Sequence, residues 1–179
     1  MNLFAMLARR RVTLGFVLGA PVLWLAQPTG ATLVAGVAMA SVGEALRIWA
    51  AGHLTKAQEV TTSGPYRWIA HPLYLGSSVI GLGLAIASAS AIVASLIAAY
   101  LLTTLTASIR SEQAFLQRAL GESGSQGNQY GASGAAGSGG RRFSLERVIA
   151  NHEHRALLGV IAAVLLLALK ATYNGWLWR

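Results

Sequence analysis

The sequence is short of charged residues and has no cysteine. Of its 179 residues 11% are charged and 54% are hydrophobic, whereas a soluble domain typically carries about 25% charged residues. A water-soluble globular domain is therefore excluded. Without cysteine, the chain can form no disulfide, no thiolate metal site and no cysteine nucleophile.

Acidic residues are also scarce, with six against fourteen lysines and arginines, so the formal net charge is +8. Such an excess can indicate nucleic-acid binding when the cations lie along one soluble face. Here the cations lie between long apolar stretches, so we expect no nucleic-acid partner. The positive charge is better explained as a signal of membrane topology.

Charge-free stretches predict an all-α integral membrane bundle of about five transmembrane helices, each needing about 20 apolar residues. The breaker Gln27-Pro28-Thr29-Gly30 divides the first stretch into two spans. The charge-free stretch 72–109 would form a helix of roughly 57 Å, about twice the hydrocarbon thickness, so we expect it to turn back at Ser88-Ala89-Ser90. The predicted spans are 12–27, 31–51, the two halves of 72–109, and 156–178.

The distribution of lysine and arginine predicts the orientation of these spans. With the N-terminus in the cytoplasm, only Lys170 and Arg179 of the fourteen cations fall outside. The positive-inside rule therefore favours a cytoplasmic N-terminus in a multi-pass protein. We expect the Lys170 side chain to extend from the outer end of the last span towards the interface.

Small residues predict where the helices approach one another. Gly36, Ala40 and Gly43 share one face of the second span, and Gly76 and Gly83 share a face of the third. Small residues at this spacing let helix backbones pack closely in a membrane. We expect these two faces to be packing faces.

Side chains capable of chemistry are predicted to gather at the cytoplasmic ends of the spans. Pro72 suits the first turn of a helix and favours an extended conformation at His71, so His71 and Tyr74 are expected at a helix mouth. Amide groups there favour an anionic ligand group, such as an amino-acid carboxylate. The predicted polar residues are His53, Tyr66, Arg67, His71, Tyr74, Arg110, Glu112, His152, Glu153 and His154.

Several of these residues have two interpretations. The hairpin returns Glu112 to the level of His71, where its carboxylate could hold an ammonium or sulfonium group; the alternative is a solvated glutamate near an ordinary interfacial histidine. Glu44 and Arg47 share a helix face and form either a structural pair or part of a site. Residues two apart point to different helix faces, so His152-Glu153-His154 predicts no metal site.

Three blocks of sequence resemble the isoprenylcysteine carboxyl methyltransferases and their bacterial relatives, which are similar to the membrane phospholipid methyltransferases. The first block is Leu46–Leu54. The second and most specific is Gly64–Gly76, which looks like the family pattern GPYRxxRHPxYxG. The third is Glu112–Leu116 followed by Leu120-Gly121, similar to EExxL and FG.

The resemblance implies a membrane methyltransferase, a single domain over residues 1–179, that uses S-adenosylmethionine in a bacterial inner membrane. The acceptor would be a lipid-linked carboxylate or another lipophilic acceptor met among the membrane lipids. Alternatives are a phospholipid amine, for which His71 would accept the proton, and a non-catalytic protein that keeps the fold. Carried over by position, the catalytic residues would be His71 and Arg47, and the cofactor-binding residues His71, Tyr74, Glu112, Tyr66 and Arg67.

Two positions depart from the family pattern. Ala70 replaces the arginine before His-Pro, and Gln113 replaces the second glutamate of the EE pair. We predict that these positions face each other, so that losing both charges avoids leaving one unpaired. Residues 123–140 contain seven glycines and four serines and are predicted to form a flexible cytoplasmic loop.

Overall fold

The first described elements are two helices separated by a short break, as the sequence predicted. The computed structural model describes residues 15, 17–54, 63–69, 71–123 and 143–175, with side chains described outside 111–123. Residues 17–25 are helical, 26–29 are not, and α2 (Gly30–His53) follows. Thr29 and Thr32 form a capping box, in which each side chain accepts a hydrogen bond from the other residue's backbone N–H, at 3.3 and 2.9 Å. This cap fixes the start of α2.

Helices α2 and α3 (Pro72–Ser88) pack closely through the predicted glycine faces. A Cβ atom added at Gly36 would lie 2.5 Å from the carbonyl oxygen of Gly83, and one added at Gly43 would lie 2.8 Å from that of Gly76. A methyl group does not fit at these distances, so only glycine allows this approach. The prediction of packing faces is confirmed.

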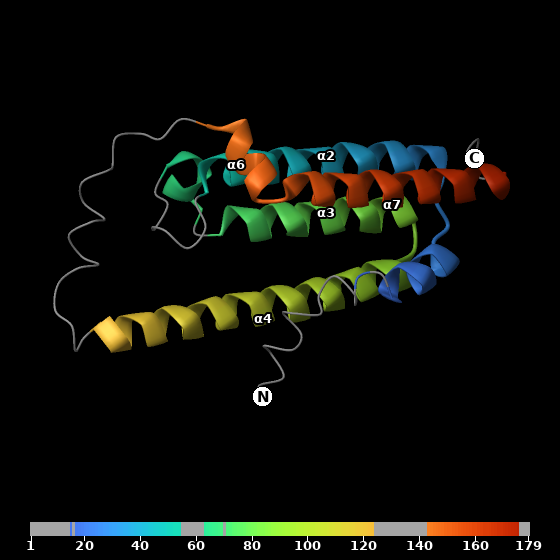
Figure 1. Ribbon diagram of the computed structural model, residues 1–179. Helices are drawn as coiled ribbons and strands as arrows, with labels where there is room; N and C mark the ends of the chain where they lie inside the picture. The colour runs from blue at the N-terminus through green and yellow to red at the C-terminus, as the bar shows by residue number, and fades with distance from the viewer. Residues whose placement is uncertain (1–14, 16, 55–62, 70, 124–142, 176–179) are drawn as a thin grey trace.

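The hairpin between α3 and α4 (Ala91–Ser123) forms where the sequence predicted it. Ala89 ends α3 in the left-handed conformation with φ of 49°, and α4 begins two residues later. Helix α4 continues past the predicted end at Ile109 to Ser123, so Ser123 is helical rather than part of the predicted loop. Figure 1 shows α4 diverging from α3 with distance from the hairpin. The rest of the predicted loop, 124–140, lies outside the described residues.

The chain returns to the bundle through α6 (Leu145–Ala150) and α7 (Glu153–Tyr173). The side-chain amide of Asn151 donates hydrogen bonds to the carbonyls of Ala51 and Leu54, at 2.9 and 3.0 Å, and so fixes the start of α7 to the end of α2. Helix α7 then runs beside α2 and α3 (Figure 1). It begins three residues before the predicted start at 156 and ends at Tyr173, before the predicted end at 178, with Asn174 as its C-cap.

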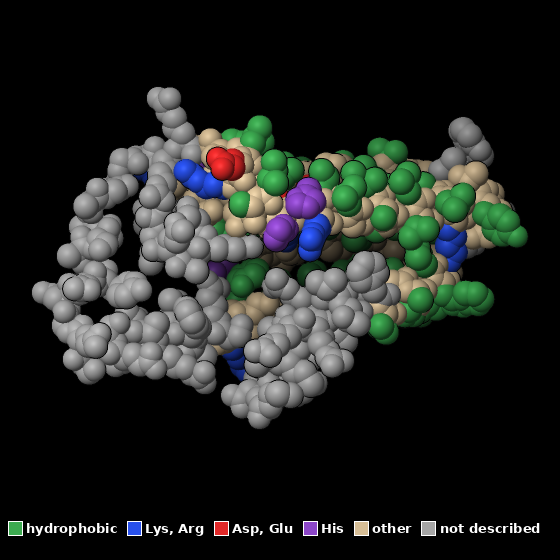
Figure 2. Space-filling model, in the orientation of Figure 1, with side chains coloured by type: hydrophobic (Ala, Val, Ile, Leu, Met, Phe, Trp, Pro, Cys, Tyr) green, Lys and Arg blue, Asp and Glu red, His purple; other side chains and the backbone are tan. Residues whose placement is uncertain are grey.

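The surface of the bundle is apolar, as a membrane-spanning protein requires. Val34, Leu102 and Leu169 are 74%, 70% and 66% exposed, and Figure 2 shows hydrophobic side chains along the length of the helices. Among the described residues, three helices are long and apolar enough to span a membrane, and the apolar α3 is shorter at 17 residues. The all-α membrane fold is confirmed; the first predicted span lies partly outside the described residues.

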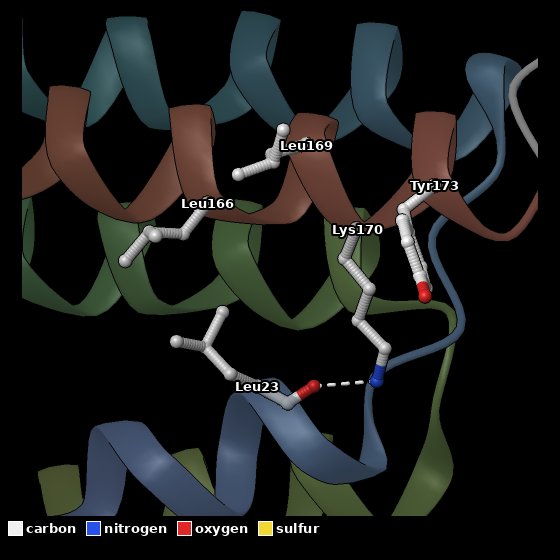
Figure 3. Close-up of a pocket in the computed structure, with 5 residues that line it drawn as sticks. All are labelled: Leu23, Leu166, Leu169, Lys170 and Tyr173. Carbon is white, nitrogen blue, oxygen red and sulfur yellow. Dashed lines mark hydrogen bonds between the residues drawn. The ribbon is translucent and has the colours of Figure 1, made fainter.

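The end of the bundle that holds Lys170 has an apolar pocket of about 340 Å³. Its lining is Leu23, Leu166, Leu169, Lys170 and Tyr173 (Figure 3). The Lys170 ammonium donates to the carbonyls of Leu23 and Trp24, at 2.5 and 2.7 Å. These are the last carbonyls of the first helix, which carry partial negative charge. The Lys170 side chain thus extends to the end of the first helix, and its predicted approach to the membrane interface stays a prediction.

Candidate functional site

The mouth of α3 begins at Pro72, as the sequence predicted, but the predicted extended conformation of His71 was wrong. Pro72 is the first helical residue, and His71 precedes it with φ of −134° and ψ of 67°. The rings of His71 and Tyr74 lie 5.4 Å apart, so these two predicted site residues are brought together. His71 makes no side-chain capping bond and is exposed, which leaves its imidazole available at the mouth.

Fewer backbone N–H groups are free to bind an anion at this mouth than the sequence suggested. Pro72 has no N–H, and the N–H groups of Tyr74 and Leu75 both donate to the carbonyl of His71 at 3.1 Å. Within the first turn, only Leu73 is left with an amide outside these bonds. The helix end is therefore a weaker anion site than predicted, because His71 itself uses two of the donors.

A short turn, η1 (Gly64–Arg67), precedes the mouth in the sequence and carries two predicted site residues, Tyr66 and Arg67. Gly64 has φ of +60°, and a Cβ atom there would lie 2.7 Å from the ring of His53. Glycine is needed for both reasons: the backbone is left-handed and the histidine ring leaves no room. The turn is thereby held against the end of α2.

Aromatic rings line the outer edge of this turn. Trp49 and Trp68 lie 6.4 Å apart, and the Arg67 guanidinium lies 5.8 Å from the ring centre of Trp68. On the other side of Trp49, the ring of His53 lies between it and Phe143, at 6.4 and 6.1 Å. Arg67, the last residue of the turn, thus contacts the neighbouring Trp68 ring, and its role in shaping the loop stays a prediction.

One turn further into the bundle lies a cluster of charged side chains that we call the charged cluster: Glu44 and Arg47 of α2, Ser77 of α3, and Glu153 of α7. The Nη2 and Nε atoms of Arg47 donate to Oε2 of Glu153 at 2.8 and 3.1 Å. Nη1 of Arg47 donates to the hydroxyl of Ser77. The charged cluster therefore joins three helices through one guanidinium.

The main partner of Arg47 is not the one that sequence spacing indicated. Glu44, three residues before it, approaches Arg47 Nε only to 4.0 Å. Glu153 is the closer partner, although it is 106 residues away. Spacing along one helix cannot detect a partner on another, and in the sequence Glu153 drew attention only as part of a doubtful metal motif. Its position among the polar residues at the helix ends was the one available signal.

Glu44 is the least satisfied member of the charged cluster. It is 5% exposed, and neither of its carboxylate oxygens has a hydrogen-bond partner. Since Ser77 follows Tyr74 by three residues, it lies on the same face of α3 as the tyrosine. Ser77, the member of the charged cluster nearest the mouth, is thus one helical turn from Tyr74, and Glu44 lies further into the bundle.

Two predicted contacts lie outside what the structure describes. The side chains of Glu112 and Gln113 fall within 111–123, and Ala70 is outside the described residues, so the proposed pairing of positions 70 and 113 stays a prediction. The last turns of α4, which carry position 112, lie at the same end of the molecule as the mouth of α3, although α4 diverges from α3 there (Figure 1). The approach of Glu112 to His71 also stays a prediction.

The His152-Glu153-His154 segment serves the helix packing. His152 has φ of 59° at the start of α7, and its ring lies 5.9 Å from that of His154. The middle residue, Glu153, is buried against Arg47. In the part of the chain that the structure describes, no group of three or more metal-binding side chains is found.

Comparison with known proteins gives one family and one curated relative. Residues 29–123, which include α2, the mouth of α3 and α4, match the phospholipid methyltransferase family. The nickel-cobalt-cadmium resistance protein NccN of Alcaligenes xylosoxydans xylosoxydans is 38% identical over 85 residues, which are 46% of this chain and 38% of that protein. The chain therefore spans well under half the length of this relative. No solved structure matches the chain.

Proposed function

Because the chain belongs to the phospholipid methyltransferase family, we propose that it is an integral membrane enzyme that transfers a methyl group from S-adenosylmethionine to a lipid-borne acceptor. The observation that carries this proposal is the position of the His71 and Tyr74 rings, 5.4 Å apart at the mouth of α3 and inside the matched region. The charged cluster begins one turn away in a bundle whose surface is otherwise apolar.

The residues at the mouth suit the chemistry of the proposed methyl donor. The donor supplies an electrophilic methyl group on a sulfonium, together with an amino-acid carboxylate. The ring of Tyr74 could contact the sulfonium through a cation–π interaction of about 0.5–2 kcal/mol. Imidazole and amide donors near His71 could hold the carboxylate, and Glu112 remains a further proposed contact. Tyr66 and Arg67 would shape the wall of this pocket.

The protein's task would be mainly to position the acceptor and to exclude water, because methyl transfer needs an in-line approach. A lipid-borne acceptor would enter from the bilayer, between the helices. This explains why such an enzyme would have an apolar surface and a polar site near the ends of its helices. We propose a bacterial inner membrane as its location, with the N-terminus and the site on the cytoplasmic side.

The charge of the site favours one of the two acceptor classes. The sequence resemblance favoured a carboxylate, which Arg47 would orient, but Glu153 already occupies Arg47. A carboxylate acceptor would add a third negative group beside Glu44 and Glu153. An amine acceptor has the complementary charge before it loses its proton, and the exposed His71 imidazole is our candidate for accepting that proton. We therefore propose a phospholipid amine as the first acceptor to test.

The experiment uses the full chain in lipid nanodiscs and the methyl donor with a radiolabelled methyl group. We expect label in the lipid fraction when phosphatidylethanolamine is present, and label in protein or prenylated carboxylates if the carboxylate alternative holds. Calorimetric titration with S-adenosylmethionine and S-adenosylhomocysteine separates either enzyme from a non-catalytic protein. No binding of either compound and no transfer would refute the proposal.

A pair of tyrosine variants tests where the donor binds. Replacement Tyr74→Ala is expected to weaken donor binding by about tenfold, since a cation–π contact of this kind contributes up to about 2 kcal/mol. The matched control is Tyr173→Ala at the opposite end of the bundle, where the side chain is 90% exposed. Equal weakening by both replacements would contradict a donor site at the mouth of α3.

A further inference from the structure

A buried carboxylate without a hydrogen-bond partner lies in the charged cluster. Glu44 is 5% exposed, and in the part of the chain that the structure describes neither of its oxygens has a hydrogen-bond partner. Buried polar groups in native structures are nearly always hydrogen-bonded, and an ionised carboxylate away from water is costly unless it is paired. Among the described residues, no hydrogen-bonding group therefore balances the carboxylate of Glu44.

Arg47 does not supply this balance, because Glu153 already uses it. Two of its nitrogens donate to a single oxygen of Glu153, at 2.8 and 3.1 Å. The distance from Arg47 Nε to Glu44 Oε2 is 4.0 Å, which is too long for a hydrogen bond. With all three groups ionised, two carboxylates share one guanidinium. The charged cluster is then short of one positive charge.

The missing positive charge of the charged cluster indicates which kind of ligand could balance it. A single missing charge suits a monovalent cation. A divalent metal ion would require more oxygen ligands than the one carboxylate that is left unpaired. An organic cation can instead bring its own apolar body into the bundle, while its charge pairs with Glu44.

The place of the deficit also matters. Arg47 contacts Ser77, which lies one turn along α3 from Tyr74, so the charged cluster is next to the mouth where we place the methyl donor. Glu44 lies one turn further into the bundle than Arg47, because the neighbouring Gly43 faces Gly76 and Ile80 of α3. A ligand bound at the mouth would therefore need to extend about two helical turns beyond Tyr74 to bring a cationic group to Glu44.

We infer that Glu44 is the counter-ion of an organic onium group that the protein binds. This inference rests on the proposed function. The sequence allowed the pair of Glu44 and Arg47 to be either structural or part of a site, and the inference gives Glu44 a positioning role in the site. The onium group is either the sulfonium of the methyl donor or the ammonium of an aminophospholipid. An ammonium would donate hydrogen bonds to the free oxygens of Glu44, whereas a sulfonium would be held by charge alone.

The first arm of the test uses two compounds that differ by one methyl group and one positive charge. S-adenosylmethionine and S-adenosylhomocysteine are titrated into the full chain and into Glu44→Gln, which keeps the size of the side chain and removes its charge. If the sulfonium is the ligand, Glu44→Gln weakens the binding of S-adenosylmethionine by about tenfold or more, as expected for a partly buried charge pair. The affinity for S-adenosylhomocysteine, which has no positive charge on sulfur, should change by less than about twofold.

The second arm tests the ammonium. Thermal unfolding is measured in nanodiscs containing phosphatidylethanolamine or phosphatidylglycerol, for the original chain and for Glu44→Gln. If the ammonium is the ligand, phosphatidylethanolamine raises the unfolding temperature of the original chain, and the variant loses this increase. The charge-matched control is Glu146→Gln on the exposed side of α6, which should change neither arm.

The outcomes separate this inference from the proposed function. If Glu44→Gln changes neither the preference for the charged donor nor the effect of phosphatidylethanolamine, the inference is overturned and Glu44 is a neutral buried acid. Binding of S-adenosylhomocysteine by the same variant reports that its site is intact. If the original chain binds neither adenosyl compound, the proposed function fails, and the lipid arm still decides whether Glu44 holds a cation.

Discussion

The contact between α2 and α3 allows a sharp test of how this bundle is held together. Replacing Gly36 by alanine would put its Cβ 2.5 Å from the carbonyl oxygen of Gly83 and 2.6 Å from the backbone nitrogen of Ala87. Ordinary contacts begin at 3.4 Å, so the two helices would have to separate by nearly 1 Å. Both neighbouring atoms belong to the backbone, so a side-chain rotation cannot relieve the clash.

The expected cost follows from comparison with a glycine that has free space. Gly159 of α7 has nothing within 4 Å of a Cβ position. Both replacements gain the same helix propensity, about 1 kcal/mol, so their difference isolates the packing cost. Overpacking of this kind typically costs about 1–3 kcal/mol. Gly36→Ala should therefore have a free energy of unfolding lower by that amount than Gly159→Ala.

The assay is unfolding in mixed micelles with increasing sodium dodecyl sulfate, followed by circular dichroism. The double variant Gly36→Ala with Gly83→Ala adds a check, because the first replacement already separates the helices at the place where the second would act. Its effect should be smaller than the two single effects combined. Equal stability of Gly36→Ala and Gly159→Ala would refute the claim that backbone contact joins α2 to α3.

Two other predictions concern the charged side chains at opposite ends of the bundle. Glu153→Gln weakens the hydrogen bonds from Arg47 and should lower the free energy of unfolding by about 1.5–3 kcal/mol. The control Glu146→Gln, on the exposed side of α6, should change the free energy of unfolding by less than about 0.5 kcal/mol. Similar values for the two variants would contradict the role of Arg47 in joining three helices. Lys170→Met removes the hydrogen-bond donor to two carbonyls at the end of the first helix. It should lower the free energy of unfolding by about 1 kcal/mol in the same assay. An unchanged free energy of unfolding would show that the ammonium does not hold that helix.

Much of the fold could be predicted because local chemistry decides it. The break at Gln27-Pro28-Thr29-Gly30 follows from a proline, a glycine and a capping threonine. The turn at Ala89 follows from a charge-free stretch too long to cross one bilayer, and the mouth at His71 follows from the proline after it. The predicted end of the fourth span near Ile109 agrees with the apolar segment Ala91–Arg110, although the helix itself continues through polar residues to Ser123.

The site could be predicted only in part. His71 and Tyr74 are three residues apart on one helical turn, so the sequence brings them together. Arg47 also has an acidic residue three positions away, Glu44. It nevertheless binds Glu153, which is 106 residues later in the sequence and lies on another helix. Residue spacing predicts partners only within one helix. Glu153 comes close to Arg47 only because α7 packs against α2 in the folded protein.

The sequence by itself determined that this chain is helical, apolar on its surface, and divided into spans at identifiable turns, because each of these depends on residues that are close neighbours. The glycines determined that two helices can touch, since no side chain stands between them. Only the tertiary structure decided that Arg47 binds Glu153, that Lys170 binds the end of the first helix, and that Glu44 has no hydrogen bond among the described residues. These outcomes depend on which helices become neighbours, and a buried charge is paired or unpaired only once they have.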